Sequence, residues 1–155
     1  MWNPVRWIFG CVRLESAAAD AALTIPRVVC GVILPVSFGM SKFPVPTWFV
    51  EDVGRLGFPA PAVFAWAAVL TEVVGSFMLA AGLATRLMGA LLVATMFVAA
   101  FVQKADAPLW ERLPSLFFLL NAYFAMVLGC GRFGADAMIR RVLPVRAVAA
   151  GEKSR

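Results

Sequence analysis

The stretch Ala60–Arg86, APAVFAWAAVLTEVVGSFMLAAGLATR, decides the fold. It stays apolar for about twenty residues, which is long enough for one helix to cross a lipid bilayer. Glu72 is its only charge before the terminal arginine, and it lies close to the midpoint. A carboxylate at that depth costs about 2.5 kcal/mol or more on insertion scales, and it normally faces a partner or a wet cavity. Glu72 is therefore the first candidate for a functional residue.

The composition of the whole chain agrees with a membrane setting. Of the 155 residues, 62% are hydrophobic and 15% are charged, whereas soluble domains carry roughly 25% charged residues. The length favours one domain, and the bilayer is its expected solvent and partner. The net charge is +5, but the basic residues fall mainly at segment ends, where they set topology and contact anionic headgroups. We therefore expect no nucleic acid partner.

Hydropathy predicts an all-α membrane protein, a bundle of four helices. The expected spans cover about residues 21–40, 62–83, 87–103 and 115–131, which together form a membrane domain over 21–131. The link Thr85-Arg86 is so short that the second and third spans must form an antiparallel hairpin. The proline- and glycine-rich loop between the first two spans is predicted to contain a short interfacial helix over Pro46–Leu56.

The two flanks of this domain are polar by comparison. Residues 1–20 fit either an amphipathic interfacial helix or a tail, and both interpretations stay open. Arg6 and Arg13 interrupt this segment, so it does not resemble a signal peptide. Residues 132–155 are predicted to be a basic cytoplasmic tail.

The distribution of basic residues predicts the orientation of the chain. On one side lie Arg6, Arg13, Arg27, Arg86, Arg132, Arg140, Arg141, Arg146, Lys153 and Arg155, and on the other lie Lys42, Arg55, Lys104 and Arg112. The richer side holds both termini. The positive-inside rule therefore places both termini in the cytoplasm.

Residues suited to metals and redox groups are scarce. The chain contains no histidine and three cysteines. Cys11, Cys30 and Cys130 form neither a CxxC pair nor a metal-ligand spacing. This excludes histidine-ligated haem and predicts that there is no metal site and no intrinsic cofactor. We expect Cys30 and Cys130 to be free thiols. The sequence does not identify a catalytic residue.

Arg27 is the candidate partner of Glu72. It lies about five residues from the middle of the first span, an offset of about 7 Å at 1.5 Å per residue, which an extended arginine can reach. A bidentate pair would make both charges tolerable in the membrane. Alternatively, Arg27 extends to the cytoplasmic surface, and Glu72 is protonated or hydrogen-bonded to a group such as Asn121. Whether Glu72 has a structural role, binds a ligand or handles a proton stays open.

Three further groups of residues are candidates for a functional role. At the cytoplasmic ends, Arg86, Arg132 and Asp136 should lie near one another, and an Arg86–Asp136 ion pair would either join the helices or help a partner dock. On the outer face, Lys42 either marks the membrane interface or lines an outward mouth above Glu72. Several phenylalanines either pack or line a quinone pocket; they are Phe97, Phe101, Phe117, Phe118 and Phe124.

An ordered set of short motifs runs along the chain. They are Arg27, Gly39-Met40-Ser41-Lys42, Gly57-Phe58-Pro59, Glu72 with Gly75, Gly82-Leu83-Ala84-Thr85-Arg86 and Gly131-Arg132-Phe133-Gly134-Ala135-Asp136. With these motifs the chain resembles the DoxX family of small four-helix bacterial inner-membrane proteins, from about Ile25 to Arg140. The resemblance implies a bundle with both termini inside. It also places the recurrent positions of the family at Arg27, Lys42, Glu72, Thr85, Arg86 and Asp136.

The resemblance also implies a range of functions. Some relatives are linked to a thiosulfate:quinone oxidoreductase or to membrane complexes that handle thiol and oxidative stress. An accessory or anchor subunit of a membrane redox complex is therefore expected, with a soluble redox partner at the cytoplasmic face and a quinone near Glu72. The alternatives are a small-molecule or proton-coupled transporter using Glu72 and a stand-alone quinone-dependent oxidoreductase for reduced sulfur compounds. Many members have His-Gly where this chain has Phe38-Gly39, which argues against a stand-alone enzyme.

Overall fold

The computed structural model describes residues 16–142, and within that range the chain is helical and has no strand. Four helical segments are long and apolar enough to cross a membrane, which confirms the predicted all-α class with four spans. The segments are Ala17–Lys42, Pro61–Ala81, Thr85–Gln103 and Leu109–Leu128. Predictions about residues 1–15 and 143–155 lie outside the described residues. Residues 17–20, which we had grouped with the N-terminal segment, belong to the first span.

The first span combines three types of helix. α2 (Ala17–Leu34) begins at Ser16, whose hydroxyl oxygen accepts a hydrogen bond from the Ala19 amide at 3.1 Å. At Pro35, which has no amide hydrogen to donate, the helix changes to the π turn η1 (Pro35–Gly39). The 3₁₀ turn η2 (Met40–Lys42) follows without a break. Lys42 is therefore the last helical residue of the first span.

A short helix, α3 (Thr47–Arg55), follows the first span and confirms the helix predicted within this loop. Its buried residues Phe49 and Val53 pack with Ala65 and Val69 of α4 (Pro61–Leu70). α4 continues through the π turn η3 (Thr71–Gly75) into α5 (Ser76–Ala81), and the three together form the second span. The burial of one face of α3 fixes the short helix against the start of this span.

The third and fourth spans form a closely packed hairpin. The third span consists of α6 (Thr85–Phe97) and the π turn η4 (Val98–Gln103), and the fourth is α7 (Leu109–Leu128), which begins at Leu109 rather than near Ser115. A Cβ atom at Gly89 would lie 2.8 Å from the Met126 amide nitrogen and 2.9 Å from the Ala122 carbonyl oxygen. A glycine is therefore needed where α6 approaches the backbone of α7.

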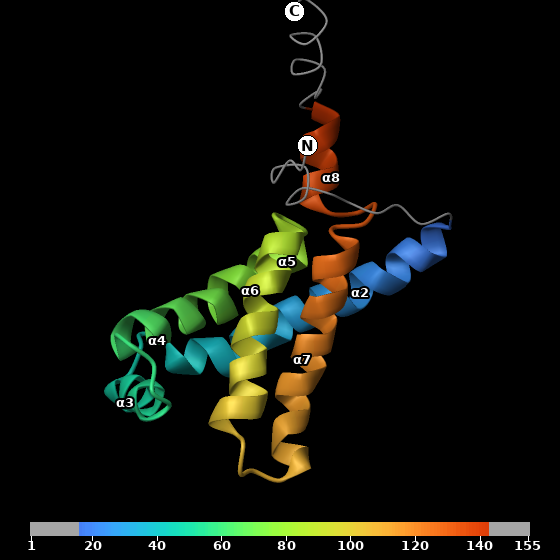
Figure 1. The fold of residues 1–155 in the computed structure, drawn as a ribbon. Coiled ribbons are helices and arrows are strands. Elements are labelled where there is room, and N and C mark those ends of the chain that lie inside the picture. Colours follow the sequence, from blue (N-terminus) through green and yellow to red (C-terminus); the bar gives the residue numbers. More distant parts are fainter. Residues whose placement is uncertain (1–15, 143–155) are drawn as a thin grey trace, which may run out of the picture.

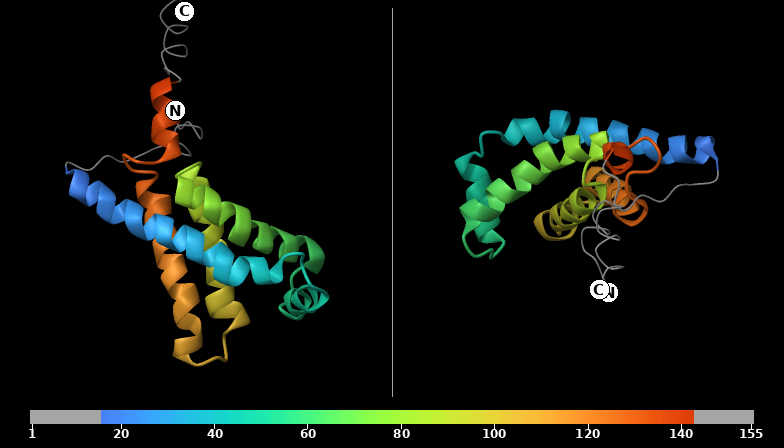
Figure 2. Two further views of the ribbon diagram at one scale, coloured as in Figure 1. Left: turned by 180° about the vertical axis from the view of Figure 1, so that it is seen from behind. Right: turned by 90° about the horizontal axis from the view of Figure 1, so that it is seen from above.

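The four spans are arranged as two helix pairs that cross (Figure 1). α2 runs beside the α4–α5 span in one pair, and α6 runs beside α7 in the other; the view from above shows the first pair lying across the second (Figure 2). The core between the pairs contains Cys30, Leu34, Leu79, Leu92, Met96, Phe118, Ala122 and Ala125. Outward-facing apolar side chains such as Val63, at 66% exposure, are suited to contact lipid.

The last described helix, α8 (Ala135–Val142), lies beyond the end of α7 and next to the α5–α6 turn (Figure 1). The Asp136 amide donates a hydrogen bond to the Gly82 carbonyl oxygen at 3.0 Å. A Cβ atom at Gly82 would lie 2.6 Å from Cα of Gly134, so this turn also requires a glycine. The α5–α6 turn, which joins the two helix pairs, is therefore hydrogen-bonded to the segment that follows α7.

Candidate functional site

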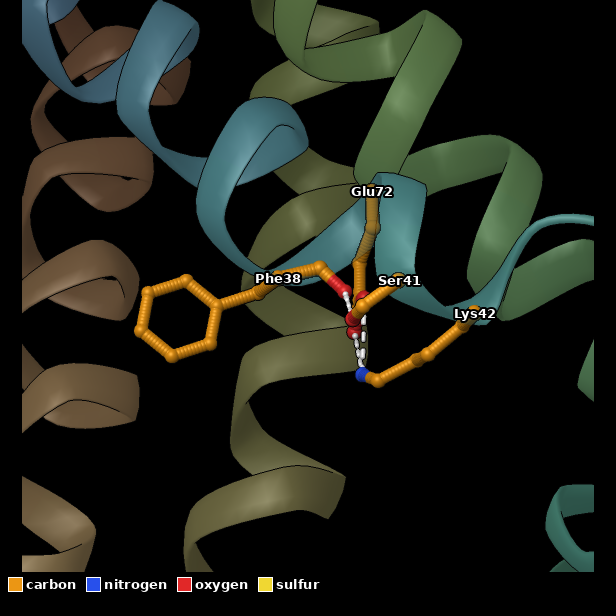
Figure 3. Close-up of polar contacts among 4 residues, drawn as sticks. All are labelled: Phe38, Ser41, Lys42 and Glu72. Atoms are coloured by element: carbon orange, nitrogen blue, oxygen red, sulfur yellow. Dashed lines mark hydrogen bonds and ion pairs between the residues drawn. The ribbon is translucent and has the colours of Figure 1, made fainter.

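Glu72 forms an ion pair with Lys42 deep in the protein. The Lys42 Nζ atom lies 2.9 Å from Oε2 and 3.2 Å from Oε1 of Glu72, so one ammonium group donates to both carboxylate oxygens (Figure 3). Glu72 is 3% exposed, and the side chain of Lys42 is 22% exposed. The predicted Arg27–Glu72 pair is therefore wrong, because the partner of Glu72 is Lys42.

The position of Arg27 along the first span explains why it does not pair with Glu72. A Cβ atom at Gly82 would lie 3.1 Å from Nη2 of Arg27, which places the guanidinium at the end of the second span. Gly82 and Glu72 are separated by about 15 Å along a helix that rises 1.5 Å per residue. Because the first span continues to Lys42, and not only to about Met40, its last residue reaches the level of Glu72.

Two π turns bring the ion pair together. η1 carries Gly39 and η3 carries Glu72, and a Cβ atom at Gly39 would lie 3.6 Å from Cβ of Glu72 and 2.8 Å from Cγ2 of Val73. The missing side chain lets η1 lie directly against η3, and Lys42, at the end of the following turn η2, then reaches the carboxylate. π turns inside α-helices occur frequently at functional sites. The Gly39-to-Lys42 motif was visible in the sequence, but the π turns were not.

Glu72 lines a cavity of about 340 Å³ between α3, α4, η3, α6 and η4. Phe49, Phe58 and Phe64 contribute aromatic surface, and Thr95 and Gln103 add polar groups. The Lys42 Nζ atom lies 5.3 Å from the ring centroid of Phe49, a cation–π contact. An apolar cavity with a few convergent polar groups is the usual form of a small-molecule site. Here Glu72 is the charged residue of the lining, and Lys42, which is not part of the lining, contacts Glu72 and Phe49 of the wall.

Position 38, where the family resemblance implied a histidine in many members, does not line this cavity. The Phe38 ring points away from the ion pair (Figure 3) and makes an edge-to-face contact with Phe118 of α7, with ring centroids 5.8 Å apart. The Phe38 carbonyl oxygen accepts a hydrogen bond from the Ser41 hydroxyl at 2.8 Å. The side chain at this position therefore belongs to the packing between the two helix pairs.

Asp136 caps the helix that begins the third span. Its carboxylate accepts hydrogen bonds from the Ala84 amide at 2.8 Å, the Thr85 amide at 3.1 Å and the Thr85 hydroxyl at 3.3 Å. The helix dipole favours a carboxylate at this end. The predicted Arg86–Asp136 ion pair is wrong: within residues 16–142 no such pair is present, and the Nε atom of Arg86 has no hydrogen-bond partner. Arg132 is exposed.

Arg27 belongs to the same end of the protein as Asp136. Its Nη1 atom donates a hydrogen bond to the Cys130 carbonyl oxygen, and its charge interacts with that of Asp136. Cys30 is buried and free, as expected, whereas Cys130 is disulfide-bonded, which corrects the expectation of a free thiol there. In the described part of the chain, no three His, Cys, Asp or Glu side chains gather in a way that could hold a metal ion.

Comparison with known proteins agrees with this architecture. The family model for DoxX matches residues 22–105, which include Arg27, Lys42, Glu72 and Thr85. The chain therefore belongs to the DoxX family of small membrane proteins. It is 31% identical over 107 residues to the protein named "Putative oxidoreductase CatD" of Bacillus subtilis (strain 168), a match that covers 69% of this chain and 78% of that protein. No solved structure matches the chain at a significant level.

Proposed function

We propose that this DoxX-family protein is an accessory or anchor subunit of a membrane redox complex and that a quinone enters the cavity beside Lys42 and Glu72. The observation that carries the proposal is that Glu72, which is buried and paired with Lys42, lines an apolar, aromatic cavity. The name of the Bacillus subtilis relative as an oxidoreductase supports a redox setting. In this proposal, the protein lies in a bacterial inner membrane with both termini in the cytoplasm.

The chemistry of the cavity suits the two forms of a quinone. In this proposal, the ammonium of Lys42, which lies outside the cavity lining but contacts Glu72 and Phe49 of the wall, turns toward the cavity and donates a hydrogen bond to a carbonyl oxygen of the oxidised form. The carboxylate of Glu72 can accept a hydrogen bond from a hydroxyl of the reduced form. The aromatic ring of Phe49 lies beside Lys42 and provides a surface on which a planar ring can stack. The sequence contains no histidine, so we expect the electrons to come from a soluble partner bound at the cytoplasmic face.

Binding of a short-chain quinone tests the cavity directly. The full chain in lipid nanodiscs is titrated with decylubiquinone, alongside the variants Lys42→Met and Glu72→Gln. The matched controls are Lys104→Met and Glu111→Gln, because these residues carry the same charges and belong neither to the Lys42–Glu72 pair nor to the cavity lining. We expect each site variant to weaken binding by about tenfold or more, equivalent to about 1.4 kcal/mol, and the controls to bind normally. Wild-type binding by both site variants would contradict the quinone site.

The accessory role has a separate test. The tagged full chain is purified from membranes in a mild detergent, and co-purifying proteins are assayed for flavin or metal redox centres. We expect a redox partner at a fixed ratio to the chain. A chain that purifies alone, and that reduces quinone by itself with a reduced-sulfur donor, would favour the stand-alone enzyme.

A second candidate function is proton-coupled transport, which the burial of Glu72 near the middle of a span favours. Transport requires Glu72 to gain and lose a proton during the cycle. In proteoliposomes, Glu72→Gln should then abolish proton-coupled flux while the protein still folds. Flux that does not respond to this substitution would exclude the role of Glu72 in transport.

A further inference from the structure

A second cavity, of about 290 Å³, lies between α2 and α7. Its lining shares no residue with the cavity beside Glu72. The walls are mostly apolar and include Leu23, Pro26, Phe117, Leu120, Phe124 and Leu128. Phe117 and Phe124 are 61% and 49% exposed on the outer surface of α7, so the apolar walls continue to the lipid-facing side of the protein.

Two buried polar atoms belong to side chains that line this cavity. The Nε atom of Arg27 and the Oδ1 atom of Asn121 are buried and have no hydrogen-bond partner. Arg27 is 5% exposed. Buried donors and acceptors are nearly always hydrogen-bonded in folded proteins, so a pair of unsatisfied groups beside one cavity indicates a partner that the protein itself does not supply.

The remaining contacts of Arg27 leave its positive charge only partly compensated. The Nη1 atom donates to the Cys130 carbonyl oxygen, and the Nη2 atom faces Gly82. Asp136 interacts with Arg27 through its charge, but its carboxylate oxygens accept hydrogen bonds from Ala84 and Thr85. Among residues 16–142, no carboxylate forms an ion pair with Arg27. An anionic group in the cavity would supply both a hydrogen-bond acceptor and the missing charge.

We propose that the α2–α7 cavity binds a free fatty acid, with its carboxylate between Arg27 and Asn121. One carboxylate oxygen accepts a hydrogen bond from Nε of Arg27. The other accepts from the side-chain amide of Asn121, which presents its NH₂ group after a half-turn of the amide. The acyl chain lies along the leucine and phenylalanine wall and leaves toward the lipid. This site is independent of the proposed quinone cavity.

A carboxylate on a single chain fits these observations better than a phospholipid does. The Nε–H group of Arg27 and the NH₂ group of Asn121, presented after the half-turn of the amide, would donate to the two oxygens of one carboxylate. The cavity of about 290 Å³ is bounded by two helices, whereas a phospholipid has a phosphate diester with two chains and a further headgroup. The apolar walls exclude a small water-soluble anion as the preferred ligand, because such an anion would leave them without a partner.

Native mass spectrometry of the full chain in detergent tests the proposal. The protein is titrated separately with palmitate, methyl palmitate and dipalmitoyl phosphatidylglycerol. Asn121→Leu and Arg27→Gln alter the site, and Thr95→Val is the control because Thr95 lines the other cavity. Folding of every variant is checked by thermal melting.

We expect one palmitate to bind per chain, with methyl palmitate and phosphatidylglycerol at least tenfold weaker. Asn121→Leu should weaken palmitate binding by tenfold or more, Arg27→Gln should abolish it, and Thr95→Val should leave it unchanged. The proposal is overturned if methyl palmitate or phosphatidylglycerol binds as tightly as palmitate. It is also overturned if Asn121→Leu binds palmitate as the wild type does, which keeps the test decisive even if Arg27→Gln fails to fold.

Discussion

The ammonium of Lys42 lies 2.9 Å from Oε2 of Glu72 and so joins the last helical residue of the first span to the middle of the second. The contact explains how a carboxylate that is 3% exposed is tolerated inside an apolar helix. It also holds the ammonium of Lys42 against Glu72, which lines a cavity. The pair is thus both part of the packing between the first two spans and the candidate binding group.

Gly39→Ala should disturb this pair without removing a charge. The new Cβ atom would lie 2.8 Å from Cγ2 of Val73, so η1 must move away from η3 or Val73 must shift. Overpacking of this kind costs about 1–3 kcal/mol, and the movement also displaces Lys42. We expect a lower melting temperature in detergent and weaker binding of decylubiquinone.

The matched control for this substitution is Gly75→Ala. Its Cβ atom would have ordinary contacts, with the nearest atom, Cγ2 of Thr71, at 3.5 Å. Shortening Val73 to alanine in the Gly39→Ala background should restore part of the lost stability. Equal melting temperatures for the wild type and Gly39→Ala would show that the close approach of η1 and η3 is not required.

Asp136→Ala should destabilise the start of the third span. The substitution removes the acceptors for the Ala84 and Thr85 amides at the beginning of α6. Loss of a capping side chain typically costs about 0.5–2 kcal/mol. Unfolding of the full chain in mixed micelles measures the loss, and Asp106→Ala, in the exposed loop after η4, is the control. If the two variants lose the same stability, Asp136 is not a helix cap.

The proposed orientation predicts which loops a membrane-impermeant maleimide reaches in whole cells. Asp106→Cys lies in the loop between η4 and α7, on the proposed outer side, and should be labelled in intact cells. Arg132→Cys is exposed at the opposite end and should be labelled only after the membrane is opened. The unmodified chain gives the background from its own cysteines. The reverse pattern would place the termini outside.

The hydropathy of the chain was sufficient to predict the four spans, and the prolines and glycines that flank residues 46–56 were sufficient to place α3. A single charge in an apolar span was also enough to select Glu72. These features depend on local composition and periodicity, which can be read from consecutive residues. The same local signals did not separate an interfacial lysine at position 42 from one that turns inward.

The partners of the charged residues depend on features that are not local. Glu72 pairs with Lys42 because the first span continues through a π turn and a 3₁₀ turn, which bring Lys42 to the depth of Glu72. Asp136 binds the Ala84 and Thr85 amides instead of Arg86, because a helix N-terminus attracts a carboxylate through backbone groups that no residue type reveals. Pairing residues by opposite charge alone therefore predicted an arginine partner for Glu72 and for Asp136, and in both cases the partner is a different group.

Two double-mutant cycles in detergent test the central claim, the Lys42–Glu72 pair, most directly. One combines Lys42→Met with Glu72→Gln, and the other combines Arg27→Gln with Glu72→Gln; each compares free energies of unfolding for the single and double variants. We predict a coupling energy of about 0.5–3 kcal/mol in the first cycle and additive losses in the second. Additive losses for Lys42 and Glu72, together with coupling between Arg27 and Glu72, would contradict the account.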